Sequence, residues 1–126
     1  MMSTAMLIVN PSSGNEAAMT YQSRVEEKLK NLYDSVIVKF TEKAGDATRF
    51  ARDAAENKLD LVMVMGGDGT VNEGVTGLAE QPHRPAFSFI PFGTVNDLAR
   101  ALGISLDPEE AVESLDSLKE KQLDIG

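Results

Sequence analysis

A run of five apolar residues passes directly into a glycine-rich segment in Leu61-Val62-Met63-Val64-Met65-Gly66-Gly67-Asp68-Gly69-Thr70. A short, continuous apolar run of this kind is typical of a strand that is buried on both faces. The three glycines around one acid predict a tight turn, because glycine adopts positive φ and lets backbone N–H groups approach a ligand closely. Residues 71–79 predict a helix, whose N-terminal dipole would point at the same turn. The segment therefore predicts a phosphate-binding site.

The rest of the chain alternates short apolar runs with helical patterns. The predicted strands are 5–10, 36–40, 61–65, 86–90 and a short one at 122–125, and the predicted helices are 17–32, 45–57, 71–79, 96–102 and one that begins at Asp107. Alternation of this kind predicts an α/β fold with three layers, α/β/α, around a mainly parallel sheet. Ligands of such sheets bind at the carboxyl ends of the strands.

The composition indicates an ordinary soluble domain. The 126 residues are 42% hydrophobic and 25% charged, which is enough for one domain with a real core. The net charge of −8 argues against a nucleic-acid partner, because phosphate backbones need a basic surface. There is no cysteine, no apolar stretch that could span a bilayer and no signal-peptide pattern, so we expect a cytoplasmic protein.

Three small, polar turns follow predicted strands, at 10–14, 66–70 and 91–97. Any one of them is explained equally well by the steric needs of a turn. Because the carboxyl ends of parallel strands meet at one edge of a sheet, the three together predict a ligand-binding site there. The chain contains no Gly-x-x-x-x-Gly-Lys-Ser/Thr motif, and the central glycine turn contains no basic residue. We therefore expect metal and backbone dipoles to carry most of the charge neutralisation.

Four motifs carry a family resemblance: Asn10-Pro11-x-Ser13-Gly14, Thr41 with Gly45-Asp46-Ala47, the glycine turn, and Pro-x-Gly-Thr-x-Asn-Asp-Leu-Ala-Arg over 91–100. On these motifs the chain resembles, over residues 5–126, the N-terminal nucleotide-binding domain of the diacylglycerol kinase catalytic family, and most of all the soluble bacterial lipid kinases. The glycine turn alone would also fit NAD kinases and phosphofructokinases. An NAD kinase-like enzyme and a non-catalytic nucleotide-sensing module remain the alternatives.

The resemblance implies a Rossmann-like fold and transfer of the ATP γ-phosphate to a lipid hydroxyl, such as that of diacylglycerol, with Mg²⁺. It also implies a second domain, a β-sandwich beyond residue 126, which supplies the general base and most of the lipid site. On this interpretation residues 1–126 are the nucleotide-binding domain and are inactive alone. Contact with the inner face of the membrane would come only through the second domain, and a homodimer stays open.

Residues 67–73 are expected to wrap the triphosphate through backbone amides, the Thr70 hydroxyl and the helix dipole. Asp68 is the first metal candidate, because a carboxylate among phosphate-facing glycines repels the triphosphate unless Mg²⁺ intervenes. Asp97 is the second metal candidate, and Arg100 is a candidate phosphate contact. The complete set of nucleotide-binding candidates is Asn10, Thr41, Gly66, Gly67, Asp68, Gly69, Thr70, Val71, Asn72, Glu73 and Thr94.

Three of these residues have structural alternatives. Asp68 would hydrogen-bond within its own turn, as aspartate does in many turns. Glu73, expected in the first helical turn, would interact with the helix dipole. Asp97 would cap a helix or pair with Arg100.

Overall fold

We describe the fold from a computed structural model, which covers residues 3–11, 17–79 and 81–91. Strands and helices alternate along it: β1 (Thr4–Val9), α1 (Ala17–Leu32), β2 (Ser35–Phe40), α2 (Asp46–Glu56), β3 (Leu61–Gly66), α3 (Asp68–Leu78) and β4 (Ala86–Pro91). Every strand and helix predicted within these ranges is present. The predicted helix at 96–102, the helix from Asp107 and the strand at 122–125 lie outside the described residues.

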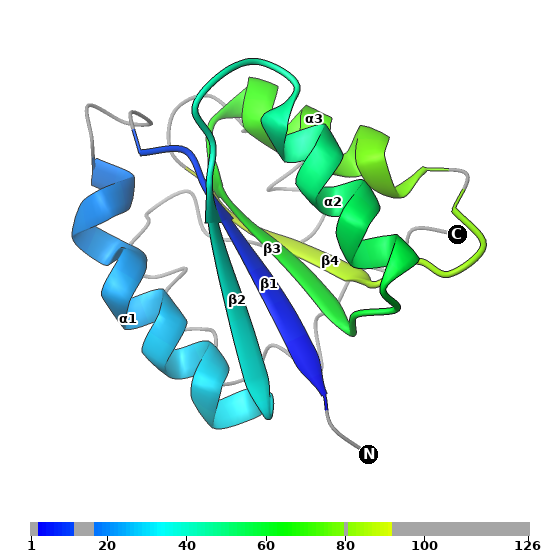
Figure 1. Ribbon diagram of the computed structural model, residues 1–126. Helices are drawn as coiled ribbons and strands as arrows, with labels where there is room; N and C mark the ends of the chain where they lie inside the picture. Colours follow the sequence, from blue (N-terminus) through cyan, green and yellow to red (C-terminus); the bar gives the residue numbers. More distant parts are fainter. Residues whose placement is uncertain (1–2, 12–16, 80, 92–126) are drawn as a thin grey trace.

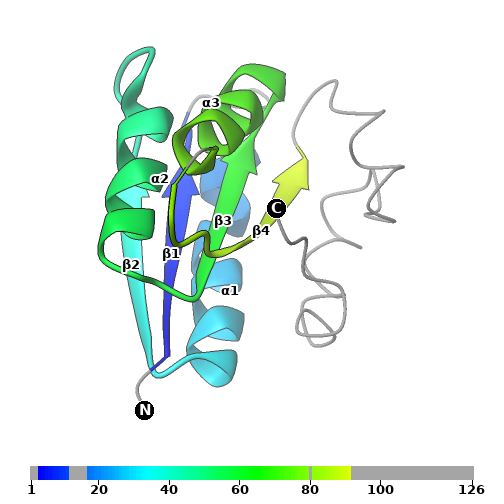
Figure 2. The ribbon, with the colours of Figure 1, turned by 90° about the vertical axis from the view of Figure 1, so that its right-hand side faces the viewer.

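The four strands form one parallel sheet in the order β2-β1-β3-β4. Helix α1 covers one face of the sheet, and α2 and α3 cover the other (Figure 1). The view turned by 90° shows the strands running in the same direction (Figure 2). The predicted three-layer α/β/α fold is therefore confirmed. No helix among the described residues is both long enough and apolar enough to cross a membrane.

Strand β3 is buried along its whole length because the sheet is covered on both faces. Successive side chains of a strand point to opposite faces. One set from β1 and β3, with Leu7 and Met63, packs against α1, and the alternate set, with Ile8 and Val64, packs against α2 and α3. The predicted apolar faces of the helices supply the other half of each core, with Val25, Leu29 and Tyr21 from α1 and Ala47, Ala51, Ala54 and Ala55 from α2.

Strand β2 differs from the expectation of a strand buried on both faces. Its side chains are only partly buried, and Ile37 and Phe40 are 37% and 41% exposed. Within the part of the chain that the structure describes, β2 pairs only with β1, so it forms an edge of the sheet. The apolar run alone did not distinguish an edge strand from a central one.

Helix α3 begins at Asp68, three residues earlier than the sequence predicted. Strand β3 passes into it through Gly67 alone, whose backbone is extended, with φ −89° and ψ −167°. Among the described residues, positive φ occurs only at Gly45 and Lys58. The expectation that the glycine-rich segment uses positive φ is therefore wrong. Because the strand leads almost directly into the helix, no separate tight turn forms.

Gly77 allows α3 to pack closely against α2. A Cβ atom at this position would lie 2.3 Å from the carbonyl oxygen of Thr48 and 2.8 Å from the Cβ of Ala51. We expect Gly77→Ala to destabilise the fold by about 1–3 kcal/mol, because a backbone carbonyl cannot move away without shifting the helix. The measurement is the free energy of unfolding in urea.

The control is Gly69→Ala in the same helix, where a Cβ would meet nothing within 4 Å. This variant should unfold with a free energy equal to or slightly above that of the wild type, since alanine favours helix over glycine. Equal destabilisation by both variants would mean that the α2–α3 contact is not the cause.

Candidate functional site

A cavity of about 440 Å³ opens at the carboxyl edge of the sheet. Its walls come from the end of β1, from the loop between β2 and α2, and from the first turns of α3; the lining residues are Asn10, Pro11, Thr41, Glu42, Lys43, Ala44, Thr70 and Glu73. The volume falls in the usual range for small-molecule sites. The fold thus brings four of the sequence candidates, Asn10, Thr41, Thr70 and Glu73, to one cavity.

The level ends of the strands explain why these residues meet. In the sheet register Val9 lies beside both Phe40 and Met65. The next residues continue the pairing, because the amide of Asn10 donates to the Met65 carbonyl at 3.0 Å and that of Thr41 donates to the Val9 carbonyl at 2.8 Å. Both side chains therefore start from the same edge of the sheet.

Asn10 and Thr70 form a direct hydrogen bond across this edge. The Asn10 Nδ2 group donates to Thr70 Oγ1 at 3.1 Å, and Thr70 is only 9% exposed. Thr70 packs closely on Gly66, where a Cβ would lie 2.7 Å from the Thr70 Cβ. Gly66 is thus required by this close approach rather than by its own backbone conformation. The Thr70 hydroxyl accepts the bond from Asn10 and still has its own O–H to donate.

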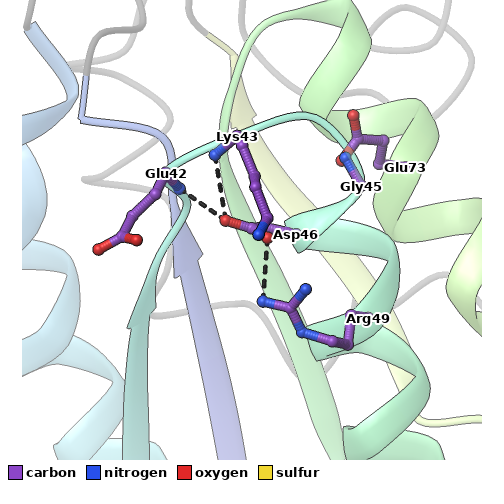
Figure 3. A network of polar contacts seen from close by, with 6 residues as sticks. All are labelled: Glu42, Lys43, Gly45, Asp46, Arg49 and Glu73. Carbon is purple, nitrogen blue, oxygen red and sulfur yellow. Dashed lines mark hydrogen bonds and ion pairs between the residues drawn. The ribbon is translucent and has the colours of Figure 1, made fainter.

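The loop between β2 and α2 is held by Asp46, a buried carboxylate at the start of α2 (Figure 3). Its Oδ2 accepts hydrogen bonds from the amides of Glu42, at 2.8 Å, and Lys43, at 3.1 Å. Its Oδ1 lies 2.9 Å from Nη2 of Arg49. The pKa of Asp46 is lower than its usual value, mainly because its carboxylate accepts the hydrogen bond from the Glu42 amide. The Lys43 amide and the Arg49 guanidinium lower it further, whereas burial acts in the opposite direction.

A second carboxylate, that of Glu73, ties the same loop to α3. Gly45 has φ +90°, which only glycine adopts without strain, and its amide donates to Glu73 Oε1 at 3.0 Å. The hydroxyl of Thr48 donates to the Glu73 carbonyl at 2.9 Å. The sequence predicted Glu73 in the first turn of this helix. Because α3 begins at Asp68, Glu73 lies in the second turn instead. Its observed partner is the loop amide, which leaves little reason to invoke the helix dipole.

The other candidates within the described residues do not line the cavity. Val71, on α3 itself, is fully buried in the core between the sheet and the α2–α3 layer, and its amide donates to the Gly67 carbonyl at 3.0 Å. Asn72 is exposed. The bond from Val71 to Gly67 is the first backbone hydrogen bond of α3. The amides before it, those of Asp68, Gly69 and Thr70, therefore have no acceptor within the helix.

The metal candidates fall outside what the structure describes. The side chain of Asp68 and the whole of Thr94, Asp97 and Arg100 are not among the described groups. Among the side chains that are described, no group of three or more His, Asp or Glu residues is arranged to hold a metal ion. The roles expected for these four residues stay predictions.

Sequence reasoning missed Lys43, a basic residue that is part of the cavity wall. The expectation that metal and backbone dipoles carry most of the charge neutralisation came from the glycine segment, which has no basic residue. Lys43 comes instead from the β2–α2 loop, two residues after Thr41, inside a motif that carried the family resemblance. Across residues 3–11, 17–79 and 81–91, no ion pair engages its ammonium group. The sequence feature that could have revealed it is a lysine between Thr41 and Gly45, two residues of the same motif, just after a predicted strand.

Known proteins resemble this chain over nearly its whole length. It is 40% identical over 126 residues to the diacylglycerol kinase of Bacillus subtilis (strain 168), a match that covers 99% of this chain and 42% of that protein. It is 42% identical over 122 residues to the diacylglycerol kinase of Staphylococcus epidermidis (strain ATCC 12228 / FDA PCI 1200), covering 97% of this chain and 39% of the relative. The chain thus spans about two-fifths of the length of these relatives.

Solved structures give the same result. The crystal structure of a diacylglycerol kinase from Bacillus anthracis str. Sterne matches with a TM-score of 0.79 and 37% identity, over 89% of this chain and 41% of that one. A phosphate-loop protein solved in solution shares the fold alone, at a TM-score of 0.52 and 19% identity. The family model described as the diacylglycerol kinase catalytic domain matches residues 4–126. The chain belongs to the diacylglycerol kinase catalytic-domain family.

Proposed function

We propose that this chain binds MgATP at the carboxyl edge of its sheet, as the nucleotide-binding part of a lipid kinase that transfers the ATP γ-phosphoryl group to a lipid hydroxyl. The observation that carries the proposal is the convergence of Asn10, Thr41, Lys43 and Thr70 on one cavity of about 440 Å³. Asn10 directly follows β1, Thr41 and Lys43 lie in the β2–α2 loop, and Thr70 lies on α3. Each of the four supplies a hydrogen-bond donor. Family membership supports the same proposal.

The donors around the cavity suit a polyphosphate. The Lys43 ammonium is a compact cation of the kind that pairs with phosphate oxygens. The unused amides at the start of α3 add donors and a favourable helix dipole. The Asn10 amide and the hydroxyls of Thr41 and Thr70 are neutral groups that can bind phosphate or sugar oxygens.

The charge balance of the cavity supports a requirement for a divalent cation. Glu42 and Glu73 bring two carboxylates, against the single ammonium of Lys43. A triphosphate adds several negative charges, which these groups cannot neutralise. Mg²⁺, when bound, would offset that charge and polarise the transferred phosphoryl group. Asp68, the first residue of α3, and Asp97 are the proposed metal contacts, with Arg100 and Thr94 as further phosphate and nucleotide contacts.

The lipid acceptor is proposed for a protein of the full length of the relatives. Two relatives carry the name diacylglycerol kinase, and this chain spans 42% and 39% of their lengths. The family resemblance implies that the general base, the lipid site and any contact with the inner face of the membrane lie in a further domain. The matched family and these relatives give no support to an NAD kinase or to a purely nucleotide-sensing module.

The proposal is tested first by binding and then by transfer. Calorimetric titration of the 126-residue chain with ATP should show one site in the presence of Mg²⁺ and weaker binding in EDTA. A protein of the relatives' full length should then phosphorylate diacylglycerol, sphingoid-base or phosphatidylglycerol vesicles with ATP. A folded chain that does not bind ATP would contradict the nucleotide-binding role, and transfer to none of these lipids would contradict the acceptor class.

Lys43→Gln should weaken ATP binding about tenfold, because it removes one charge-assisted contact to phosphate. Adenosine, which has no phosphate, should bind both proteins equally. The matched control is Lys39→Gln, which removes the same charge from an exposed position on β2. If Lys43→Gln and Lys39→Gln bind ATP equally well, Lys43 does not contact the phosphates.

Asp68→Asn should leave the fold intact but weaken MgATP binding and flatten its dependence on Mg²⁺ concentration. The amide keeps the shape of the carboxylate, whereas Mg²⁺ prefers charged oxygen ligands. The measurement is the ATP dissociation constant over a series of Mg²⁺ concentrations, with thermal melting as the check on folding. Asp53→Asn, at an exposed position on α2, controls for the loss of one negative charge.

The competing role for Asp68 is a hydrogen bond within its own segment, where asparagine is an equally good residue. In that case Asp68→Asn would bind MgATP as the wild type does, with an unchanged Mg²⁺ dependence. That result would remove Asp68 from the proposed metal site.

A further inference from the structure

The loop that brings Lys43 to the cavity, residues 41–45, depends on groups outside it for its shape. Its residues 41–44 all line the cavity. Asp46 holds the loop at Glu42 and Lys43, and Glu73 holds it at Gly45. Glu73 lines the cavity itself, whereas Asp46 does not and is only 2% exposed. Any effect of Asp46 on a ligand must therefore act through the loop.

The bonds of Asp46 run backward along the chain. A carboxylate at a helix start commonly accepts from amides of the first turn. Here Oδ2 accepts instead from the amides three and four residues earlier, at 3.1 Å and 2.8 Å. The Asp46 amide also donates to the Lys43 carbonyl, at 3.3 Å. Lys43 is thus held by Asp46 through both its N–H and its C=O group.

Arg49, three residues further along α2, forms an ion pair with the other oxygen of the Asp46 carboxylate. Its Nη2 lies 2.9 Å from Asp46 Oδ1, while Arg49 itself is half exposed. Oδ1 forms this ion pair but accepts no hydrogen bond from the described residues, whereas Oδ2 accepts from the two loop amides (Figure 3). Gly45, in the left-handed conformation, lets the chain turn from the loop into α2.

We propose that Asp46 is a positioning residue for nucleotide binding, which fixes the backbone of Glu42 and Lys43 and so sets the shape of the cavity wall that residues 41–44 form. The inference rests on the proposed function, because the cavity must bind a phosphate-containing ligand. Without this acceptor the two amides have no partner in the loop, and the loop would sample other conformations. A ligand would then have to reorder it, which lowers affinity.

A purely structural role for Asp46 makes a different prediction. A negative charge at the start of α2 stabilises the helix through its dipole, whatever the exact position of the oxygens. In that case any acidic residue would serve, and the charge would matter for stability alone. In the positioning role the location of Oδ2 matters and the charge matters less.

Two variants separate charge from geometry. Asp46→Asn removes the charge but keeps an oxygen that can accept both loop amides, and the half-exposed Arg49 can turn to water. Asp46→Glu keeps the charge but moves the oxygens by one methylene group. We expect ATP affinity within about threefold of the wild type in Asp46→Asn and at least about tenfold weaker in Asp46→Glu. Asp53→Glu, at an exposed position on α2, is the matched control and should bind ATP normally.

The measurements are the MgATP dissociation constant, thermal melting and hydrogen exchange at the amides of Glu42 and Lys43. Exchange should be faster in Asp46→Glu and nearly unchanged in Asp46→Asn. If Asp46→Glu does not fold, Asp46→Ser, whose side chain is too short to reach both amides, replaces it with the same expectations.

A folded Asp46→Glu or Asp46→Ser protein with wild-type ATP affinity would overturn the inference and leave the proposed function standing. Equal loss of affinity in Asp46→Asn would also overturn it, because charge would then be the cause. If the wild-type chain itself does not bind MgATP, the proposed function is overturned and the inference with it.

Discussion

Burial of β3 on both faces is the constraint on which the rest of the structure depends. None of its side chains from Leu61 to Met65 is exposed to solvent, so helices must cover the sheet on both sides. Each such side chain contributes roughly 1.5–3 kcal/mol when it is fully buried. A strand buried in this way has no tolerance for a shift in register, because a slip of one residue would exchange its two faces. The fixed register in turn sets where β3 ends.

Strands β1, β2 and β3 end at the same height in the sheet, so the residues that follow them lie around one cavity. Asn10 and Thr41 follow their strands at the same height, and Thr70 comes from the helix that begins after β3. Gly66 lets Thr70 settle against the backbone, where it accepts the hydrogen bond from Asn10. The polar groups of the cavity are therefore held by the core beneath them, which is the arrangement that a preorganised binding site needs.

The β2–α2 loop is held differently, by two carboxylates rather than by apolar packing. Its residues 42–45 are exposed, so burial contributes little to its shape. Hydrogen bonds to Asp46 and Glu73 replace that contribution, and they connect the loop to α2 and α3. Since α3 also carries the unused amides near Thr70, the same contacts connect the loop to the N-terminal end of that helix.

Sequence alone determined the layers, the strands and the edge of the sheet that carries the site, because apolar periodicity directly reports which faces are buried. It also indicated Asn10, Thr41, Thr70 and Glu73, since polar residues after parallel strands must meet at one edge. It did not determine the start of α3, the edge position of β2, the place of Lys43 in the cavity wall or the hydrogen bonds of Asp46. These features depend on contacts between distant segments, such as the hydrogen bond from the Gly45 amide to Glu73. They also depend on hydrogen bonds from the backbone to a single side chain, such as that from the Glu42 amide to Asp46. Only the tertiary structure decides such contacts, because pattern and propensity describe each segment by itself, whereas the partner of a buried polar group is set by how the segments pack.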